Sequence, residues 1–338
     1  MKRHRLVVLS RRGRHALSSE HWAEIERWAD VTVVRTDTAP DRRSAVRVLA
    51  GADLVGATNL CLPAIDAELL DALPELRGIV LYATGYDHLD IPLLASRGVG
   101  LSVLPDYATT SVAEHCLAML FALATRLHLA NDRSRGQVGP GVSLRGVELS
   151  GRTLGVVGVG RIGGAVAHRA RLLGMEVLGT DPDEAAADRA RAQGVTMMAP
   201  DELLAHCDAV AVCASHTFGA PPVLGRVELA ALRPGALVVN VARPALVDTA
   251  AVLESVRSER IRGYAVDDSV LDPVRDHDVL SQGRVLQTGH SAWWRDETLE
   301  RGARMWGERL LAAVQDRPRD TVTWPATEPA GLTAEVVG

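Results

Sequence analysis

The stretch LGVVGVGRIGGAVAHRARLLGMEVLGTDPD, residues 154–183, decides the fold of this protein. It has the pattern of an apolar strand, a glycine-rich turn, a helix and a second strand that ends at Asp181. The turn carries G-x-G-x-x-G at Gly158, Gly160 and Gly163. Such glycines allow a tight turn, close approach of a pyrophosphate and close packing of the helix on the strand. The stretch therefore predicts a Rossmann dinucleotide-binding unit.

The same stretch also predicts which dinucleotide binds. The backbone N–H groups near Arg161 and Ile162 open the helix, where they can face phosphates. Asp181 can accept hydrogen bonds from an adenosine ribose and repels a 2′-phosphate. No basic residue follows in Pro182–Glu184 to hold such a phosphate, so we expect NAD rather than NADP. A glycine-rich turn that merely packs a helix is the alternative, and the strands and the acid in register argue against it.

Strands and helices alternate on both sides of this stretch, which is typical of α/β layering. Upstream, apolar runs predict strands at residues 6–10, 31–34, 52–55, 79–82 and 100–103, with helices over 19–28 and 43–49. Downstream, strands are predicted at residues 209–213, 236–241, 263–266 and 285–287. A chain of 338 residues is long enough for two domains. We expect two doubly wound parallel sheets.

Four longer segments complete the sequence-based outline. Residues 110–126 predict a helix that is buried on most sides, and Ser111 with Glu114 resembles a capping box at its start. Residues 131–150 are rich in glycine, arginine and serine and predict an exposed connection. A last helix is predicted over residues 295–315, and the tail from residue 321 shows no periodicity.

Composition excludes several classes of function. Lys2 is the one lysine among 37 basic residues, so Schiff-base chemistry, a Walker-type phosphate loop and a kinase strand lysine are excluded. A net charge of −5 argues against nucleic-acid binding. The apolar run Leu6–Leu9 is too short for a signal-peptide core or a membrane span. The four cysteines form no metal-ligand pattern and predict buried, reduced thiols, so we expect a cytoplasmic protein without a metal.

Three polar residues follow predicted strands downstream of the glycine-rich turn: Arg243, Asp267 and His290. In a doubly wound sheet, residues just past the carboxyl ends of strands gather at the ligand crevice. An arginine fork suits a carboxylate, and a histidine can pass a proton to a carbonyl while a nicotinamide delivers hydride. These residues predict reversible reduction of a 2-oxo acid to a 2-hydroxy acid.

At this point the chain resembles the D-isomer-specific 2-hydroxyacid dehydrogenase family, over about residues 50–310. The stretches that carry the resemblance are YATGYDHLDI (82–91), PDYATTSVAEHCLAMLFAL (105–123), LGVVGVGRIG (154–163), LRPGALVVNVAR (232–243) and QTGHSAWW (287–294). The resemblance implies a flavodoxin-like substrate domain of residues 1–104 and 291–338. It implies a Rossmann NAD-binding domain of residues 105–290, a ligand cleft between the two, and a homodimer formed partly through the helix near 111–127.

The resemblance also implies roles for individual positions. Arg243 holds the substrate carboxylate and orients the 2-oxo group, and His290 donates the proton during reduction. The substrate-binding positions are Thr84 and Gly85, through their backbone N–H groups, and Trp293. For Trp293, core packing or a dimer contact is nearly as good an explanation. The cofactor-binding positions are Gly158, Gly160, Arg161, Ile162, Gly163, Asp181, Val241 and Asp267.

The chain departs from the family pattern at three positions near these residues. Val270 stands where we expect a glutamate that supports the catalytic histidine, Pro244 stands where glycine is common, and Gly289 replaces a proline before the histidine. Either His290 works unsupported, or Asp272 or another acid supports it. We interpret Asp106, Asp268 and Asp272 as solvated loop acids.

Other members of the same fold offer alternatives. A catalytically impaired NAD sensor or corepressor-like protein is the second hypothesis, because Val270 cannot stabilise an imidazolium. Phosphite oxidation is disfavoured because that branch carries a lysine where Thr84 stands here. Formate oxidation is disfavoured because no glutamine can be assigned as partner of the histidine. The sequence leaves open which 2-hydroxy acid is the substrate.

Overall fold

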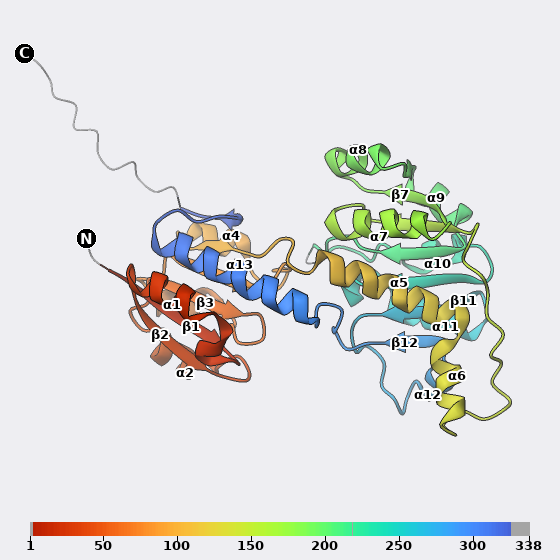
Figure 1. Cartoon of the computed structure of the whole chain (residues 1–338), viewed down its shortest axis with the longest axis horizontal. Coiled ribbons are helices and arrows are strands. Elements are labelled where there is room, and N and C mark those ends of the chain that lie inside the picture. The colour runs from red at the N-terminus through yellow and green to blue at the C-terminus, as the bar shows by residue number, and fades with distance from the viewer. Residues whose placement is uncertain (1–2, 218, 326–338) are drawn as a thin grey trace, which may run out of the picture. The chain divides into compact units, whose positions relative to one another are not determined.

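The protein consists of two compact units (Figure 1). The computed structural model describes residues 3–217 and 219–325. The terminal unit comprises Met1–Tyr107 with Asp296–Gly338, and the central unit comprises Ala108–Arg295. The chain therefore passes between the units twice, at 107/108 and at 295/296, whereas the resemblance puts these boundaries at 104/105 and 290/291.

The terminal unit is built on a six-stranded sheet in the order β13-β5-β4-β3-β1-β2. The strands are β1 (His4–Ser10), β2 (Ala29–Arg35), β3 (Leu54–Thr58), β4 (Gly78–Tyr82), β5 (Gly100–Ser102) and β13 (Thr321–Thr323). The first five run parallel, and β13 joins β5 antiparallel at the edge. The parallel order 2-1-3-4-5 is that of flavodoxin-like folds, so the prediction of a flavodoxin-like sheet is confirmed.

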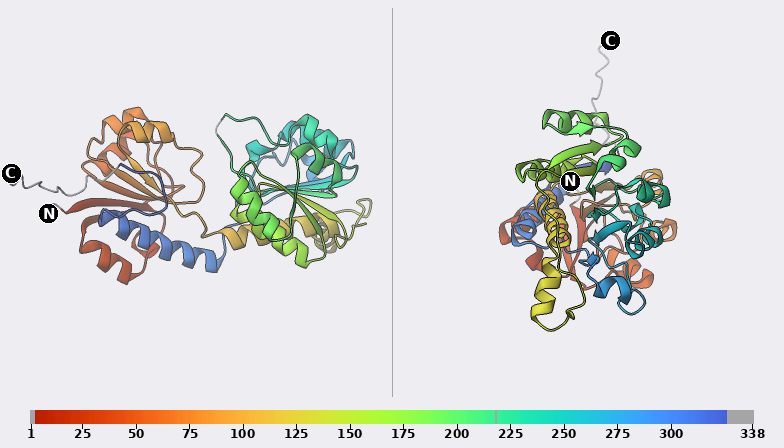
Figure 2. Two further views of the ribbon diagram at one scale, coloured as in Figure 1. Left: turned by 90° about the horizontal axis from the view of Figure 1, so that it is seen from above. Right: turned by 90° about the vertical axis from the view of Figure 1, so that its right-hand side faces the viewer.

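Helices cover both faces of this sheet (Figure 2). The red helix α1 (Ser19–Glu26) and the blue helix α13 (Asp296–Val314) share one face. The opposite face carries α2 (Arg42–Leu49), α3 (Ala67–Asp71) and α4 (Ile91–Ser96), and a short helix η1 (Gly13–Ala16) follows β1. The four α-helices α1–α4 begin after Ser18, Asp41, Asp66 and Asp90, whose side chains each accept a backbone N–H of the first turn.

The central unit contains a seven-stranded, all-parallel sheet in the order β12-β11-β10-β9-β6-β7-β8. The strands are β6 (Thr153–Val157), β7 (Glu176–Thr180), β8 (Thr196–Met197), β9 (Ala209–Val212), β10 (Ala236–Asn240), β11 (Ile261–Val266) and β12 (Val285–Gln287). Counted within the unit, this is the Rossmann order 3-2-1-4-5-6 with one further strand. The prediction of two doubly wound parallel sheets is confirmed.

Helices also cover both faces of the central sheet. α5 (Thr109–Thr125) and α7 (Arg161–Leu172) pack together on one face, and α9 (Pro200–His206), α10 (Arg226–Ala231) and α11 (Thr249–Arg257) lie on the other (Figure 2). The remaining helices are α6 (Leu127–Ser134), α8 (Glu184–Ala192), α12 (His277–Ser281) and η2 (Pro244–Leu246). Because the helices cover the faces of the sheet, the carboxyl ends of the strands are surrounded by loops.

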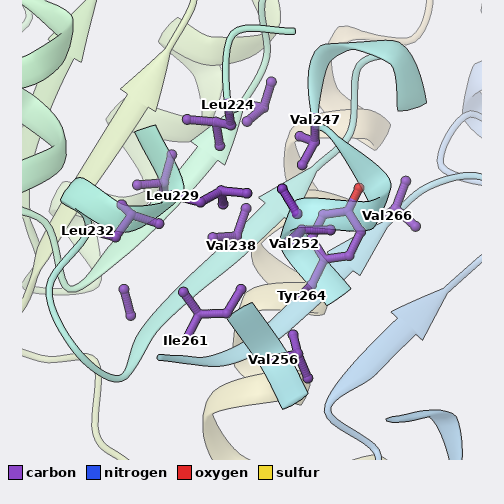
Figure 3. Close-up of a cluster of buried hydrophobic side chains, with 14 of the residues drawn as sticks. Leu224, Leu229, Leu232, Val238, Val247, Val252, Val256, Ile261, Tyr264 and Val266 are labelled. Carbon is purple, nitrogen blue, oxygen red and sulfur yellow. The ribbon is translucent and has the colours of Figure 1, made fainter. Parts of the chain in front are cut away.

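A dense apolar cluster lies between the central sheet and the helices α10 and α11 (Figure 3). Its buried members include Leu224, Leu229, Leu232, Val238, Val247, Val252, Val256, Ile261, Tyr264 and Val266. Because the strands are buried on both faces, they appear in the sequence as nearly continuous apolar runs. This core fixes the strands β10 and β11, which the polar candidates Arg243 and Asp267 follow.

Two sequence-based expectations were wrong in detail. The Ser111–Glu114 capping box does not form, because the helix already begins at Thr109 after the N-cap Ala108, and the Ser111 hydroxyl donates to the Ala108 carbonyl. The connection predicted at 131–150 begins inside helix α6, which ends at Ser134.

The tail beyond the last helix also differs from expectation. Strand β13 pairs with β5 although the sequence shows no alternating pattern there. The Trp324 ring packs over Gly100 and Gly78, where an added Cβ would lie 2.4 and 2.5 Å from ring atoms. Residues 326–338 of the predicted tail lie outside the described residues.

The cysteines are found as the sequence predicted. In the described residues the four cysteines are free thiols, three of them buried and one partly buried. No single described helix is long and apolar enough to cross a membrane, although α5 and α6, bent by 65°, pass that test as a pair by length and composition.

One buried tryptophan anchors helix α13 in the terminal unit. Trp306 is fully buried and its indole N–H donates to the Val80 carbonyl at 3.0 Å. We expect Trp306→Phe to destabilise this unit by about 2 kcal/mol, because it removes a hydrogen bond and buried volume. The thermal midpoint should fall by roughly 4–8 °C in scanning calorimetry. Trp28→Phe is the matched control, since Trp28 is 43% exposed, and an equal loss there would contradict the prediction.

Candidate active site

The glycine-rich turn between β6 and α7 is shaped by close backbone contacts. Gly158 has φ +87°, and a Cβ there would lie 2.5 Å from the Cα of Ala214. A Cβ on Gly163 would lie 1.8 Å from the Gly158 carbonyl oxygen. Each of these positions therefore requires glycine, which gives the sequence pattern its physical cause.

The third member of the pattern faces open space. A Cβ on Gly160 would meet no atom within 4 Å, and Gly160 is the N-cap of α7 without any side-chain cap. The first turn of the helix, which contains Arg161 and Ile162, therefore presents backbone N–H groups that have no helical acceptor. An open approach over Gly160 to a helix N-terminus fits the pyrophosphate of a dinucleotide.

Asp181 lies at the carboxyl end of β7 and links two segments of the turn. Its carboxylate accepts the Val159 N–H at 2.8 Å and the Asp183 N–H at 2.9 Å. A cavity of about 290 Å³ opens beside it, lined by Thr180, Asp181, Glu184, Ala187, Arg191, Met197, Met198, Ala199 and Pro200. The guanidinium of Arg191 in this lining is paired with Glu184 at 2.6 Å and with Asp188 at 2.7 Å.

Arg243 is held just past the end of β10 by the buried Asn240. The Asn240 amide donates to the Arg243 carbonyl at 2.7 Å and accepts the Ala242 N–H at 2.9 Å. Pro244 occupies the first position of helix η2, where its missing N–H costs nothing and its fixed φ suits the helix. The glycine-to-proline departure from the family pattern is therefore compatible with the loop. Val241, the neighbouring cofactor candidate, is buried and donates to the Val212 carbonyl.

Tyr264 supports this arrangement from the adjacent strand β11. It is 1% exposed, and burial raises the pKa of its hydroxyl far above the usual range, opposed in part by a hydrogen bond with Asn240. The hydroxyl therefore stays neutral and helps to fix the Asn240 amide.

Asp267, past the end of β11, is buried and binds the loop that carries His290. Its carboxylate accepts the Thr288 hydroxyl at 2.7 Å, the Ser291 N–H at 2.8 Å and the Ala292 N–H at 3.1 Å. Its own backbone N–H extends the sheet by donating to the Asn240 carbonyl. The loops after three adjacent strands, β10, β11 and β12, are therefore joined to one another.

His290 is half-exposed and has an unusual backbone. Its φ is +57°, and Gly289 before it has φ +61°. Proline is restricted to φ near −65°, so the proline usual in the family could not adopt the conformation that Gly289 has here. The Nδ1 atom of His290 lies 3.9 Å from a carboxylate oxygen of Asp268. Asp268, interpreted as a solvated loop acid, does lie in a loop with 33% of its side chain exposed, and its carboxylate faces the histidine.

The residues considered as support for His290 lie elsewhere. Val270 is partly buried against the apolar cluster, and the Gln287 side chain accepts the N–H groups of Val270 and Leu271. Asp272 is exposed, and the N–H groups of Val274 and Arg275 hold the pKa of its carboxyl below the usual range. Asp106 is also exposed, as expected. Within the described residues, Asp268 is thus the carboxylate that pairs with the His290 ring.

The substrate candidates of the terminal unit follow strand β4. The Thr84 hydroxyl donates to the Leu104 carbonyl at 2.7 Å, which fixes the start of the loop. In the described part of the chain, the backbone N–H groups of Thr84 and Gly85 have no hydrogen-bond acceptor. The remaining candidate, Trp293, belongs to the central unit and forms an edge-to-face pair with Trp294 at 5.0 Å.

Sequence reasoning missed several residues that organise this site: Asn240, Gln287, Thr288, His115 and Arg295. Asn240 and Gln287 end apolar strands, and such a polar residue at a strand end is a usable signal. His115 lies inside an apolar helix, 173 residues from its hydrogen-bond partner Thr288, so only the folded chain reveals it. Among the described residues, no group of three His, Cys, Asp or Glu side chains could hold a metal ion.

The adjacent glycines 163 and 164 allow a matched test of the turn. Gly163→Ala should destabilise the central unit by about 1–3 kcal/mol or more, because its Cβ collides with backbone. Gly164→Ala should be neutral or stabilising by up to about 1 kcal/mol, since its Cβ would lie an ordinary 3.6 Å from the Val159 oxygen. Thermal unfolding and NADH fluorescence titration measure both effects. Equal behaviour of the two variants would contradict the assigned packing.

Comparison with known proteins agrees with this geometry. The family model "D-isomer specific 2-hydroxyacid dehydrogenase, NAD binding domain" matches residues 117–292. The D-3-phosphoglycerate dehydrogenase of Mycobacterium leprae is 33% identical over 261 residues, which are 77% of this chain and 49% of that protein. The chain thus spans about half the length of such curated relatives.

Two further relatives are similar over their full lengths or nearly so. The glyoxylate reductase of Korarchaeum cryptofilum is 30% identical over 299 residues, 87% of each chain. The crystal structure of the TT0316 protein from Thermus thermophilus superposes with a TM-score of 0.78 at 30% identity, over 94% of this chain and all of that one. The chain belongs to the D-isomer specific 2-hydroxyacid dehydrogenase family, and its central unit contains the NAD-binding domain of that family.

Proposed function

We propose that this protein is an NAD(H)-dependent oxidoreductase that interconverts a 2-oxo acid and a D-2-hydroxy acid. One observation carries the proposal: Arg243, Asp267 and His290 follow the adjacent parallel strands β10, β11 and β12 in a sheet that also bears the dinucleotide turn. A fixed cation, a buried acid and a half-exposed histidine at one sheet edge suit an anionic substrate that must gain or lose a proton.

In this proposal each residue has a separate task. Arg243 binds the substrate carboxylate through its guanidinium fork and thereby orients the 2-oxo group. His290 donates a proton to the carbonyl oxygen during reduction and takes it back during oxidation. Bound NADH supplies the hydride. Asp267 keeps the His290 loop in place and contributes to the cofactor site.

The terminal unit would contribute the backbone N–H groups of Thr84 and Gly85 to the same carboxylate. Their lack of acceptors among the described residues supports this role, because free N–H groups need an anionic or carbonyl partner. Trp293 would bound the substrate pocket.

NAD is the proposed cofactor form because of Asp181. Its carboxylate ends β7 beside the turn, where it would accept ribose hydroxyls and repel a 2′-phosphate. The residues of the turn that would hold the pyrophosphate are Gly160, Arg161 and Ile162.

Oxidation of NADH over a panel of 2-oxo acids tests the function directly. Glyoxylate, hydroxypyruvate, pyruvate and branched or aromatic 2-oxo acids form the panel. Turnover of one of these acids with NADH supports the proposal. Tight NADH binding without turnover of any of them would favour the second hypothesis, an NAD sensor or corepressor-like protein.

The His290 role predicts a specific kinetic defect. His290→Ala should lower kcat by about 10²–10⁴-fold, the usual contribution of a positioned general acid, with little change in NADH affinity. Arg243→Lys should instead raise KM for the 2-oxo acid, because lysine cannot form the bidentate contact. Steady-state kinetics and NADH titration separate the two, and an active His290→Ala variant would refute the role.

The acid beside His290 predicts a positioning effect. The Asp268 carboxylate lies 3.9 Å from Nδ1 of the half-exposed ring and restricts its orientation, so Asp268→Asn should lower kcat for reduction. Asp272→Asn is the matched comparison and should leave kcat unchanged, because Asp272 binds a turn instead. Steady-state kinetics of both variants decides between them. If Asp272→Asn lowers kcat and Asp268→Asn does not, Asp272 is the supporting acid.

We propose a homodimer as the working assembly, formed partly through α5. The family resemblance supports it, and Leu127, which begins the next helix, is an apolar side chain 67% exposed in the single chain. Light scattering after size-exclusion chromatography measures the mass.

A further inference from the structure

The hydrogen bonds around Asp267 continue into helix α5, far along the chain. The Thr288 hydroxyl donates to Asp267 at 2.7 Å, and the same oxygen lies 3.0 Å from Nε2 of His115. His115 Nε2 is also 3.7 Å from the Asp267 carboxylate. His115 in α5 is thus linked to the His290 loop through the hydroxyl group of Thr288.

The donors and acceptors in this hydrogen-bond network determine the protonation of the two His115 ring nitrogens. A carboxylate only accepts, so the Thr288 proton points to Asp267 and the Thr288 oxygen is left to accept from His115. Nε2 of His115 therefore carries a proton. Nδ1 accepts from the Arg295 guanidinium at 3.0 Å, so it carries none. His115 is a neutral ring that donates at one end and accepts at the other.

The surroundings of His115 favour this neutral form. Its side chain is 12% exposed. Burial lowers the pKa of His115, the Asp267 carboxylate opposes that effect, and the Arg295 cation adds to it. A protonated ring would lose its acceptor for Arg295 and place two cations in contact.

The loop is held from a second direction by Arg295. Its guanidinium donates to the Ser291 carbonyl at 3.2 Å and to the Trp294 carbonyl at 2.8 Å, as well as to His115. Ser291, the residue directly after His290, is therefore held by Asp267 at its N–H and by Arg295 at its C=O. His115 contacts both sides of this arrangement: its Nε2 lies near Thr288 and Asp267, and its Nδ1 accepts from Arg295.

We infer that His115 and Thr288 are positioning residues that fix the His290 loop by orienting the Asp267 carboxylate toward the N–H groups of Ser291 and Ala292. The inference rests on the proposed role of His290. His290 needs such support, because the residues at 289 and 290 both have positive φ and the ring itself is half-exposed. Neither His115 nor Thr288 touches the reacting atoms in this assignment.

Thr288→Val is the sharpest test, because it removes one hydroxyl and keeps the side-chain shape. We expect the amides of Ser291 and Ala292 to exchange with solvent about tenfold faster, measured by NMR or mass spectrometry. We expect kcat to fall about tenfold while the KM for NADH changes less than about twofold. Thr125→Val in α5 is the matched control, since among the described residues its exposed hydroxyl binds only the Phe121 carbonyl, and both readouts should stay unchanged.

His115 is tested by a pair of variants. His115→Phe removes both nitrogens and should resemble Thr288→Val, whereas His115→Gln retains a donor near the Nε2 position and should recover most of the loss in kcat and exchange protection. Normal NADH affinity shows that a variant is folded. Unchanged exchange at Ser291 and Ala292 in Thr288→Val would overturn the inference, and so would faster exchange with an unchanged kcat.

The proposed function and the role of His115 and Thr288 can fail separately. If the parent protein turns over no 2-oxo acid, the proposed function fails, and amide exchange alone then decides whether His115 and Thr288 hold the loop. If the parent is active and His115→Phe equals the parent in both readouts, the function stands and the inference about His115 is wrong.

Discussion

The candidate site depends on one geometric constraint, the common edge at which parallel strands end. The ladder of β10, β11 and β12 continues one step past the strands, because the Asp267 N–H donates to Asn240 and the Thr288 N–H donates to Val266. These bonds align three loops whose sequences are far apart. Without that alignment, neither the arginine nor the histidine would have a fixed relation to the dinucleotide turn.

Polar side chains at the strand ends turn this alignment into defined loop shapes. Asn240 fixes the Arg243 backbone, Asp267 binds the loop after β12, and Gln287 binds the segment that contains Val270. Asn240 and Asp267 are buried and Gln287 is partly buried, and each makes at least two hydrogen bonds. Where the chain departs from its family, at Pro244 and Gly289, the local backbone explains the departure. A proline suits the first position of η2, and glycine suits a positive φ.

Much of the fold could be predicted from local sequence signals. The apolar runs marked the parallel strands except the two-residue β8, and helical spacing marked the helices found at Ser19–Glu26 and Arg42–Leu49. One error arose where a tertiary contact decides, because β13 is a strand that completes the edge beside β5. The Ser111–Glu114 pattern fails for a local reason, because the helix already begins at Thr109 and Ser111 bonds back to Ala108. The sequence did not mark Asp268 as a neighbour of His290, because their distance depends on two loops meeting.

The sequence by itself determined the dinucleotide turn, the two doubly wound sheets and the family, because glycine spacing, strand periodicity and capping residues act over short stretches of chain. It also marked Arg243 and His290, since both follow recognisable strands. Only the tertiary structure decided which groups support them. The pairing of Asp268 with His290, the hold of Asp267 on Ser291 and the reach of His115 to Thr288 join residues distant in the chain. Such contacts depend on how the strand ends align, which no local pattern specifies.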